Sequence, residues 1–182
     1  MALQFTTSYL EDSLSLFRYY KGLAERAMKQ LTDEQLVMVL DEEMNSVAII
    51  VKHLSGNMQS RWTGFPEADG EKPGRDRDAE FADPPATREA LLELWESGWT
   101  CLFHSLGRLV DSDLNRSTTI RGEAHSVMQC INRQVAHYAY HCGQIVFLAK
   151  QLRTQDWKCL TIPKGSSASF NRRVAAGEAS QR

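Results

Sequence analysis

The stretch that decides the fold is QCINRQVAHYAYHCGQIVFLAK, residues 129–150. Its apolar side chains recur every three or four positions, as at Tyr138, Cys142 and Ile145, and this spacing places them on one face of an α-helix. The same pattern continues on both sides and predicts a helix over about residues 125–153. Because a helix must bury its apolar face against another element, the pattern also predicts partner helices.

Three more segments show helical periodicity, and they cover about residues 6–31, 44–63 and 87–110. Val and Ile residues near the start of the second segment make a β-strand the alternative there, but the length of the periodic run favours a helix. A turn at residues 32–34 follows the first segment and leads into a short stretch, up to residue 42, that can also be helical. The sequence therefore predicts an all-α protein with four long helices.

The connection between the second and third predicted helices indicates their order in space. Residues 64–85 read GFPEADGEKPGRDRDAEFADPP, and this Gly, Pro and charge content predicts a loop. Antiparallel neighbours in a bundle need only short connections, whereas parallel neighbours need a crossing of their full length. A helix of about twenty residues is roughly 30 Å long, and a loop of this size can span it. We therefore expect a four-helix bundle with up-down-down-up order and a crossover between helices two and three.

Chain length and composition favour a single domain without a nucleic-acid or membrane partner. The 182 residues suit one core, and we expect a domain over residues 1–171 that ends in an ordered segment, WKCLTIPKGSSASFN, followed by a disordered tail at 172–182. The 21 Lys and Arg nearly balance the 23 Asp and Glu, which gives no electrostatic reason for binding nucleic acid or anionic membrane. No apolar run suggests a membrane span and no signal peptide is evident, so we expect a cytoplasmic protein.

Three of the five histidines form a candidate metal site. His137 and His141 are four residues apart, so they lie one helical turn apart on the same face, where two imidazoles can chelate one ion. His53 lies at the margin of the apolar face of the second predicted helix, as the other two do on the fourth. We expect the three rings to converge between the two helices. The alternative is a core His53 bonded to a backbone carbonyl and an ordinary pair on the other helix.

The ligand type restricts the metal and suggests a reactive site. Three imidazole nitrogens suit a divalent transition metal, with Zn or Ni favoured and Fe or Co also suitable. Three protein ligands leave a coordination position open for water or substrate. Polar neighbours on the two helices are candidates for hydrogen bonding to the ligands or for binding a substrate, with Arg61 or Arg133 as the anchor for a carboxylate; the alternative is a solvated helix edge. These neighbours are Asn57, Arg61, Arg133, Gln134 and Gln144.

Longer motifs resemble a known superfamily. HLSGNMQSRW at 53–62, INRQVAHYAYHCGQI at 131–145 and the segment at 157–171, together with the long crossover, resemble the DinB-like (YfiT-type) superfamily of metal-binding bacterial four-helix bundles. Within it they are most similar to a branch of unknown function, over about residues 6–171.

The resemblance implies that His53, His137 and His141 bind a divalent metal ion and that the protein forms a homodimer. Some members of the superfamily are transferases of low-molecular-weight thiols such as bacillithiol, and others are mycothiol-dependent isomerases. The aromatic residues spread around the first predicted helix, among them Tyr19 and Tyr20, also favour a symmetric dimer.

The leading functional hypothesis is a metal-dependent transferase that moves a low-molecular-weight thiol onto an electrophile in detoxification or stress response, because a metal ion deprotonates a bound thiol. A metal-dependent hydrolase would need a carboxylate as general base, and neither helix has an acidic residue near its histidines. A non-enzymatic metal- or ligand-binding stress protein is the other alternative, and a purely structural bundle is the plainest one. The sequence identifies no catalytic residue.

Overall fold

Hydroxyl side chains fix where the long helices begin. The computed structural model describes residues 7–180, and its long helices are α1 (Tyr9–Met28), α3 (Val47–Trp62), α4 (Arg88–Leu106) and α5 (Val127–Arg153). Each follows a Ser or Thr whose hydroxyl accepts a hydrogen bond from a backbone N–H of the first turn. These residues are Ser8, Ser46, Thr87 and Ser126. The helices therefore begin slightly later than the periodicity predicted; the predicted start at residue 6 lies outside the described residues.

Shorter elements connect the long helices. They are α2 (Asp33–Val37), the 3₁₀ turns η1 (Ala79–Phe81), η2 (Asp111–Asn115) and η3 (Thr154–Asp156), the strands β1 (Ser117–Ile120) and β2 (Glu123–Ser126), and α6 (Ser167–Ala175). The described part of the chain is mostly helical, with six α-helices and one two-stranded sheet. The predicted all-α class is thus confirmed in outline, and the small sheet is an addition that the sequence reading missed.

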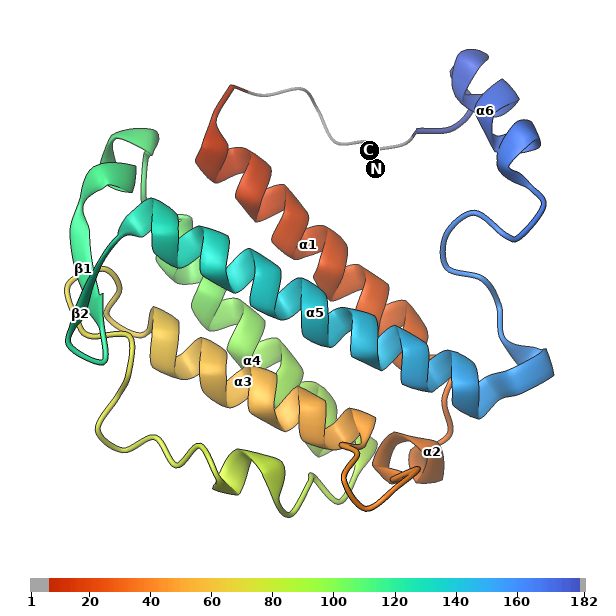
Figure 1. Cartoon of the computed structure of the whole chain (residues 1–182), viewed down its shortest axis with the longest axis horizontal. Coiled ribbons are helices and arrows are strands. Elements are labelled where there is room, and N and C mark those ends of the chain that lie inside the picture. Colours follow the sequence, from red (N-terminus) through yellow and green to blue (C-terminus); the bar gives the residue numbers. More distant parts are fainter. Residues whose placement is uncertain (1–6, 181–182) are drawn as a thin grey trace.

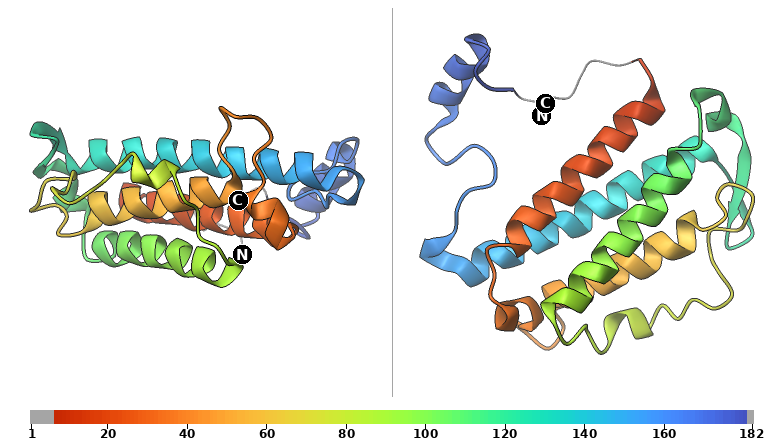
Figure 2. Two further views of the ribbon diagram at one scale, coloured as in Figure 1. Left: turned by 90° about the horizontal axis from the view of Figure 1, so that it is seen from below. Right: turned by 180° about the vertical axis from the view of Figure 1, so that it is seen from behind.

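The four long helices pack side by side. The most extensive contacts are those of α3 with α4 and of α1 with α5, and smaller contacts of α3 with α5 and of α1 with α4 join the two pairs. Figures 1 and 2 show α3 and α4 running in one direction and α1 and α5 in the opposite direction. The segment at 63–87 returns along the outside of α3, and its turn η1 contacts that helix. This segment is called the crossover below.

A β-hairpin caps one end of the molecule (Figure 1). Its strands pair antiparallel, and its turn residues Arg121 and Gly122 both have positive φ, at 57° and 77°, as a two-residue hairpin turn requires. The Asp69 carboxylate, on the crossover, accepts hydrogen bonds from the backbone N–H groups of Arg121 at 2.9 Å and of Gly122 at 2.8 Å. The crossover therefore holds the tip of the hairpin in place.

A buried chain of hydrogen bonds links the core to the interface of α3 and α5. Phe17, Trp62 and Tyr138 are at most 1% exposed and pack ring against ring. The Trp62 indole N–H donates to the Tyr138 hydroxyl at 3.0 Å, and that hydroxyl donates to Oδ1 of Asn57 at 3.1 Å. Because buried polar groups need partners, this chain fixes the Asn57 side chain.

The C-terminal segment differs from the prediction. Helix α6 includes residues 172–175, for which the sequence predicted disorder, and none of its residues is buried. Figure 1 shows α6 apart from the four long helices. Within residues 7–180, none of the helices has the length and apolar character needed to cross a membrane.

Candidate metal centre

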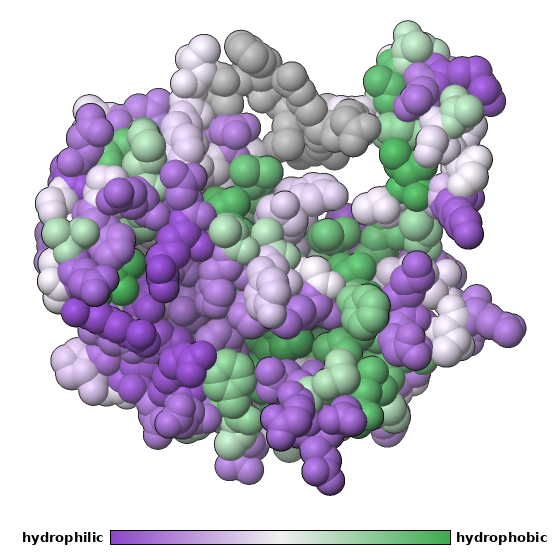
Figure 3. Space-filling view, in the orientation of Figure 1, coloured by the Kyte–Doolittle hydropathy of each residue, from purple (hydrophilic) through white to green (hydrophobic). Residues whose placement is uncertain are grey.

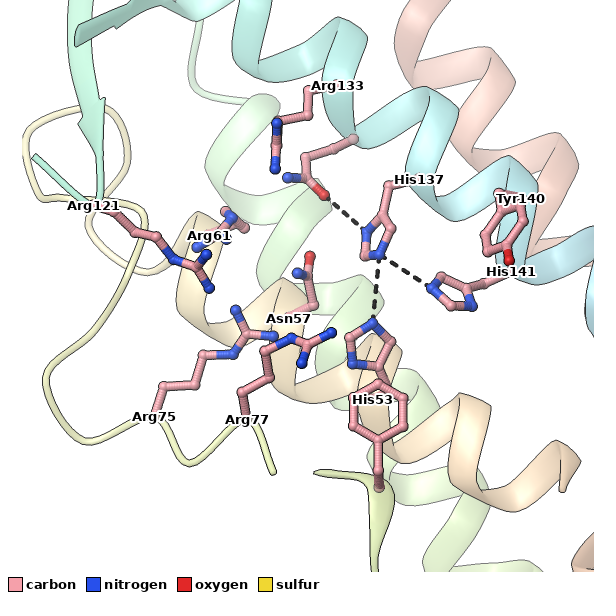
Figure 4. A pocket seen from close by; sticks show the side chains of 12 residues that line it. His53, Asn57, Arg61, Arg75, Arg77, Arg121, Arg133, His137, Tyr140 and His141 are labelled. Carbon is pink, nitrogen blue, oxygen red and sulfur yellow. Dashed lines mark hydrogen bonds between the residues drawn. The ribbon is translucent and has the colours of Figure 1, made fainter. Parts of the chain in front are cut away.

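Three imidazoles meet between α3 and α5. Nε2 of His137 lies 3.4 Å from Nε2 of His53 and 3.1 Å from Nε2 of His141 (Figure 4). One ring nitrogen from each residue falls within 4.8 Å of the other two, and this is the group of possible metal ligands among residues 7–180. The structure thus brings together the three histidines that the sequence singled out.

The outer nitrogen of each ring faces an oxygen atom. The pairs are His53–Glu80 at 2.8 Å, His137–Gln134 at 3.3 Å and His141–Gln144 at 2.7 Å, each from Nδ1 to a side-chain oxygen. Because carboxylate and amide oxygens accept hydrogen bonds, Nδ1 is the protonated nitrogen in each neutral ring. Every Nε2 then presents a lone pair, and three lone pairs face one another with no hydrogen between them.

A metal ion fits this arrangement. A cation is the partner that three converging lone pairs require, and a hydrogen bond from the outer nitrogen is the usual support of a metal-binding histidine. Nitrogens around a tetrahedral ion, with metal–nitrogen distances of about 2.1 Å, lie roughly 3.4 Å apart. The two Nε2 separations of 3.4 and 3.1 Å match that spacing. The group can therefore hold a divalent transition metal.

Burial keeps His137 and His141 neutral, as metal binding requires. Desolvation lowers the pKa of His137 to about 3, with further lowering by the neighbouring His141 and His53. Desolvation likewise lowers the pKa of His141 to about 4, against a smaller opposing effect of its hydrogen bond to Gln144. Both rings are accordingly uncharged at pH 7, the form that coordinates metal.

Glu80 is a residue of the site that the sequence reading missed. It comes from η1 on the crossover, is 6% exposed, and binds His53 through Oε2. Burial alone would raise the pKa of Glu80, but hydrogen bonds from His53 and Arg75, with the Arg75 charge, outweigh burial and lower it. The sequence analysis considered only the two helices, which indeed have no acidic residue near their histidines, whereas Glu80 belongs to the crossover.

Gly56 is the sequence signal for this contact. A Cβ atom on Gly56, in the middle of α3, would lie 2.5 Å from Oε1 of Glu80. Glycine in a helix interior destabilises it by about 0.5–1 kcal/mol relative to alanine, so its presence between His53 and Asn57 indicates close approach by another group.

A chain of ion pairs holds Glu80. Arg75 donates from Nε to Oε1 of Glu80 at 2.7 Å and from Nη2 to Oε2 at 2.9 Å. Arg75 also contacts Glu71 at 3.2 Å, and Glu71 accepts from Nη1 of Arg61 at 2.8 Å. The same Arg61 atom donates to the carbonyl of Gly70. Arg61, one of the two predicted carboxylate anchors, is therefore largely occupied by the protein itself.

A cavity of about 560 Å³ opens beside the histidines. Five arginines line it together with the three histidines and Asn57, Gln134, Phe81 and Tyr140; the arginines are Arg61, Arg75, Arg77, Arg121 and Arg133. Four of the five predicted neighbours thus line the cavity, namely Asn57, Arg61, Arg133 and Gln134. Gln144 lines an adjoining groove and contacts the site through His141. Figure 3 shows hydrophilic residues gathered over the hairpin and the crossover.

The fold and this geometry define a mostly helical protein with a possible three-histidine metal site. The chain belongs to the family described as "Protein of unknown function (DUF1572)", whose model matches residues 4–166. No curated protein is significantly similar to the chain.

Proposed function

We propose that this protein is a metal-dependent transferase that moves a low-molecular-weight thiol onto an electrophile, in detoxification or stress response. The observation that supports it is the convergence of three Nε2 lone pairs at the wall of a cavity of about 560 Å³. A divalent ion held there, Zn or Ni in first place and Fe or Co as further candidates, supplies an open coordination position and lowers the pKa of a thiol.

Each residue of the site has a role in this proposal. His53, His137 and His141 hold the ion, and Glu80 with the two glutamines fixes the orientation of their rings. The arginine-lined side of the cavity binds the anionic part of the thiol, and Asn57 offers it a further hydrogen bond. A bound ion would lower the pKa of a thiol at its open position, and the proton released there would pass to solvent through the cavity.

A hydrolase is the weaker candidate. It needs a carboxylate free to take a proton from water. Glu80 is the acidic residue nearest to the histidines in the contacts described above, and its two oxygens are engaged by His53 and Arg75. A non-enzymatic binding protein fits the histidines equally well, but the volume of the cavity favours a site for a thiol together with its acceptor.

The proposal also covers the superfamily, the topology, the location and the oligomeric state of the protein. We place the protein in the DinB-like superfamily, as an up-down-down-up four-helix bundle with one domain over residues 1–171. We also propose a cytoplasmic homodimer without nucleic-acid or membrane partners. The dimer rests on α1, where Phe17 is buried in the core but Tyr19 remains 44% exposed.

Elemental analysis of the purified protein, followed by thiol-conjugation assays with several low-molecular-weight thiols, tests this proposal. We expect about one equivalent of a transition metal per chain, and loss of both metal and conjugation in His53→Ala. His125→Ala, which changes a histidine that bonds the backbone carbonyl of Glu123, is the matched control and should change neither. A protein that binds none of Zn, Ni, Co or Fe would contradict the proposal. Metal binding without conjugation of any thiol would leave the non-enzymatic alternative.

A further inference from the structure

The cavity beside the histidines has an excess of positive charge. Its lining includes five arginines and no Asp or Glu among the described residues. Two carboxylates lie just behind the lining, Glu71 and Glu80, and they pair with Arg61 and Arg75. Five guanidinium charges therefore face two carboxylates, which leaves an excess of three. An excess of this size in one cavity calls for an anionic ligand.

Three arginines account for this excess. Arg77 lies over the ring of Phe81 at 5.1 Å, and neither it nor Arg133 has an ion pair with any residue in 7–180. Arg121 contacts Glu71 at 3.4 Å, but that carboxylate already binds two other arginines at shorter distance. Arg77, Arg121 and Arg133, called the arginine triad below, come from the crossover, the hairpin turn and α5. Figure 4 shows their guanidinium groups directed toward one space beside Asn57.

The remaining polar atoms around that space are donors. Nε of Arg61 is buried and has no hydrogen-bond partner in the described part of the chain. Oδ1 of Asn57 is taken by the Tyr138 hydroxyl, and Oε1 of Gln134 is taken by His137, so each amide retains its NH₂ group. A site whose free groups are donors and cations selects a ligand with several acceptors and negative charge.

We propose that the arginine triad is a subsite for a dianionic group, so that the ligand reaching the three histidines carries at least two negative charges. The inference rests on the proposed function where it takes the ligand to be a thiol. That thiol would then have a carbon skeleton with two carboxylates. The same chemistry describes a phosphate group, and the two sources are separated by experiment.

The structure also explains how Arg121 is positioned. It lies in the hairpin turn, whose backbone N–H groups are held by the Asp69 carboxylate at 2.8–2.9 Å. Gly70, next to Asp69, donates its N–H to the carbonyl of Thr119 at 2.8 Å. Arg77 is thus part of the crossover itself, and the crossover also holds the turn that carries Arg121. Arg133 lies on α5.

Calorimetric titration of the full chain, with and without added Zn, tests the subsite with succinate and inorganic phosphate as probes. Arg77→Gln, Arg121→Gln and Arg133→Gln should each weaken binding about three- to tenfold, and the triple variant should abolish measurable binding. Arg172→Gln on α6 removes the same charge far from the cavity and should have no effect. All four positions are exposed, so these variants should fold, and circular dichroism checks it. Binding that is equal in the wild-type and triple-variant proteins would overturn the subsite.

The choice between phosphate and dicarboxylate follows from the same titrations. Tighter binding of phosphate than of succinate, lost in the triple variant, assigns the subsite to a phosphate group. The reverse order assigns it to two carboxylates. Either result supports a dianion subsite.

A spectroscopic experiment tests the anion subsite and the proposed thiol chemistry independently of each other. In Co-loaded protein, thiolate coordination is followed by the cobalt absorption spectrum, with mercaptosuccinate compared against 2-mercaptoethanol. We expect mercaptosuccinate to bind at least tenfold more tightly than 2-mercaptoethanol, and the ratio of the two affinities to fall toward one in the triple variant. Equal binding of the two thiols would overturn the subsite and leave thiol transfer standing. Succinate binding that depends on the triad, without any thiol reaching the cobalt, would keep the subsite and contradict thiol transfer.

Discussion

Nδ1 of His53 lies 2.8 Å from Oε2 of Glu80, a residue 27 positions further along the chain. The first belongs to a long helix and the second to the crossover, so the orientation of one candidate metal ligand depends on how a loop folds. A carboxylate in this position fixes the ring and increases the basicity of the nitrogen that binds the ion. The crossover is therefore part of the site rather than only a connection.

Glu80→Gln should weaken metal binding about 10- to 100-fold, because the substitution removes the charge that polarises His53 and leaves Arg75 without its bidentate partner. Competition with a chromophoric chelator measures the change. Glu93→Gln, on an exposed position of α4, is the matched control and should have wild-type affinity. Unchanged affinity in Glu80→Gln would show that the negative charge of Glu80 has no influence on the ligand.

Gly56→Ala and Gly143→Ala should act in opposite directions. A Cβ at Gly56 would lie 2.5 Å from Oε1 of Glu80, so this variant should lose both stability and metal affinity. A Cβ at Gly143 meets nothing within 4 Å, so this variant should gain about 0.5–1 kcal/mol in the free energy of unfolding. Urea unfolding measures both. A stabilised Gly56→Ala protein with normal metal affinity would contradict the assigned role of Glu80.

The metal-free protein should lose stability as the pH falls from 6.5 to 5. Burial lowers the pKa of His137 to about 3 and that of His141 to about 4, against 6.5 for an exposed histidine. Between these values the two histidines bind protons in the unfolded chain but stay neutral in the folded chain, so the free energy of unfolding falls as the pH falls. Above pH 6.5 the two histidines are neutral in both the folded and the unfolded chain, and their full contribution to the free energy of unfolding is present.

Urea unfolding at pH 7 and pH 5 measures this dependence. The double variant His137→Gln/His141→Gln should show a smaller drop, since carboxylates titrate mainly below pH 5. The same drop in wild type and double variant would place its cause elsewhere in the molecule.

Asp69→Ala should loosen the hairpin and the arginine triad together. The Asp69 carboxylate accepts hydrogen bonds from three backbone N–H groups, those of Glu71, Arg121 and Gly122. The side chain of Thr119, together with these N–H groups, holds the pKa of Asp69 far below its usual range. The variant should have a Tm lower by a few degrees and weaker succinate binding. Scanning calorimetry and titration measure the two effects. Asp78→Ala, at an exposed crossover position, is the control, and equal behaviour of the two variants would contradict the role of Asp69.

The helical parts of the molecule could be predicted because periodicity reports which face of a helix is buried. His53, His137 and His141 lie at the margins of apolar faces, so their places follow from position along a helix. The hairpin was missed because its strands are only four residues long, although the Arg121–Gly122 pair is a usable turn signal.

The loop-borne residues of the site had no such signal. Glu80, Arg75 and Arg77 lie in a segment without periodicity, and their positions depend on long-range contacts such as that of Glu80 with His53. Charge in a loop ordinarily indicates solvent exposure. Only Gly56, an unfavourable residue within a helix, hints that something approaches α3 there.

The division of the site between helices and crossover has an evolutionary consequence. The histidines lie on α3 and α5, whose packing maintains the core, whereas Arg75, Arg77 and Glu80 lie on the crossover, which runs along the outside of α3 (Figure 1). Surface loops tolerate insertion and substitution far better than packed helices do. Relatives with the same helices and a crossover that keeps Glu80 but differs at Arg77 and its neighbours can therefore retain the ion while diverging in the molecules they accept, so that new specificities arise by changing a single stretch of the gene.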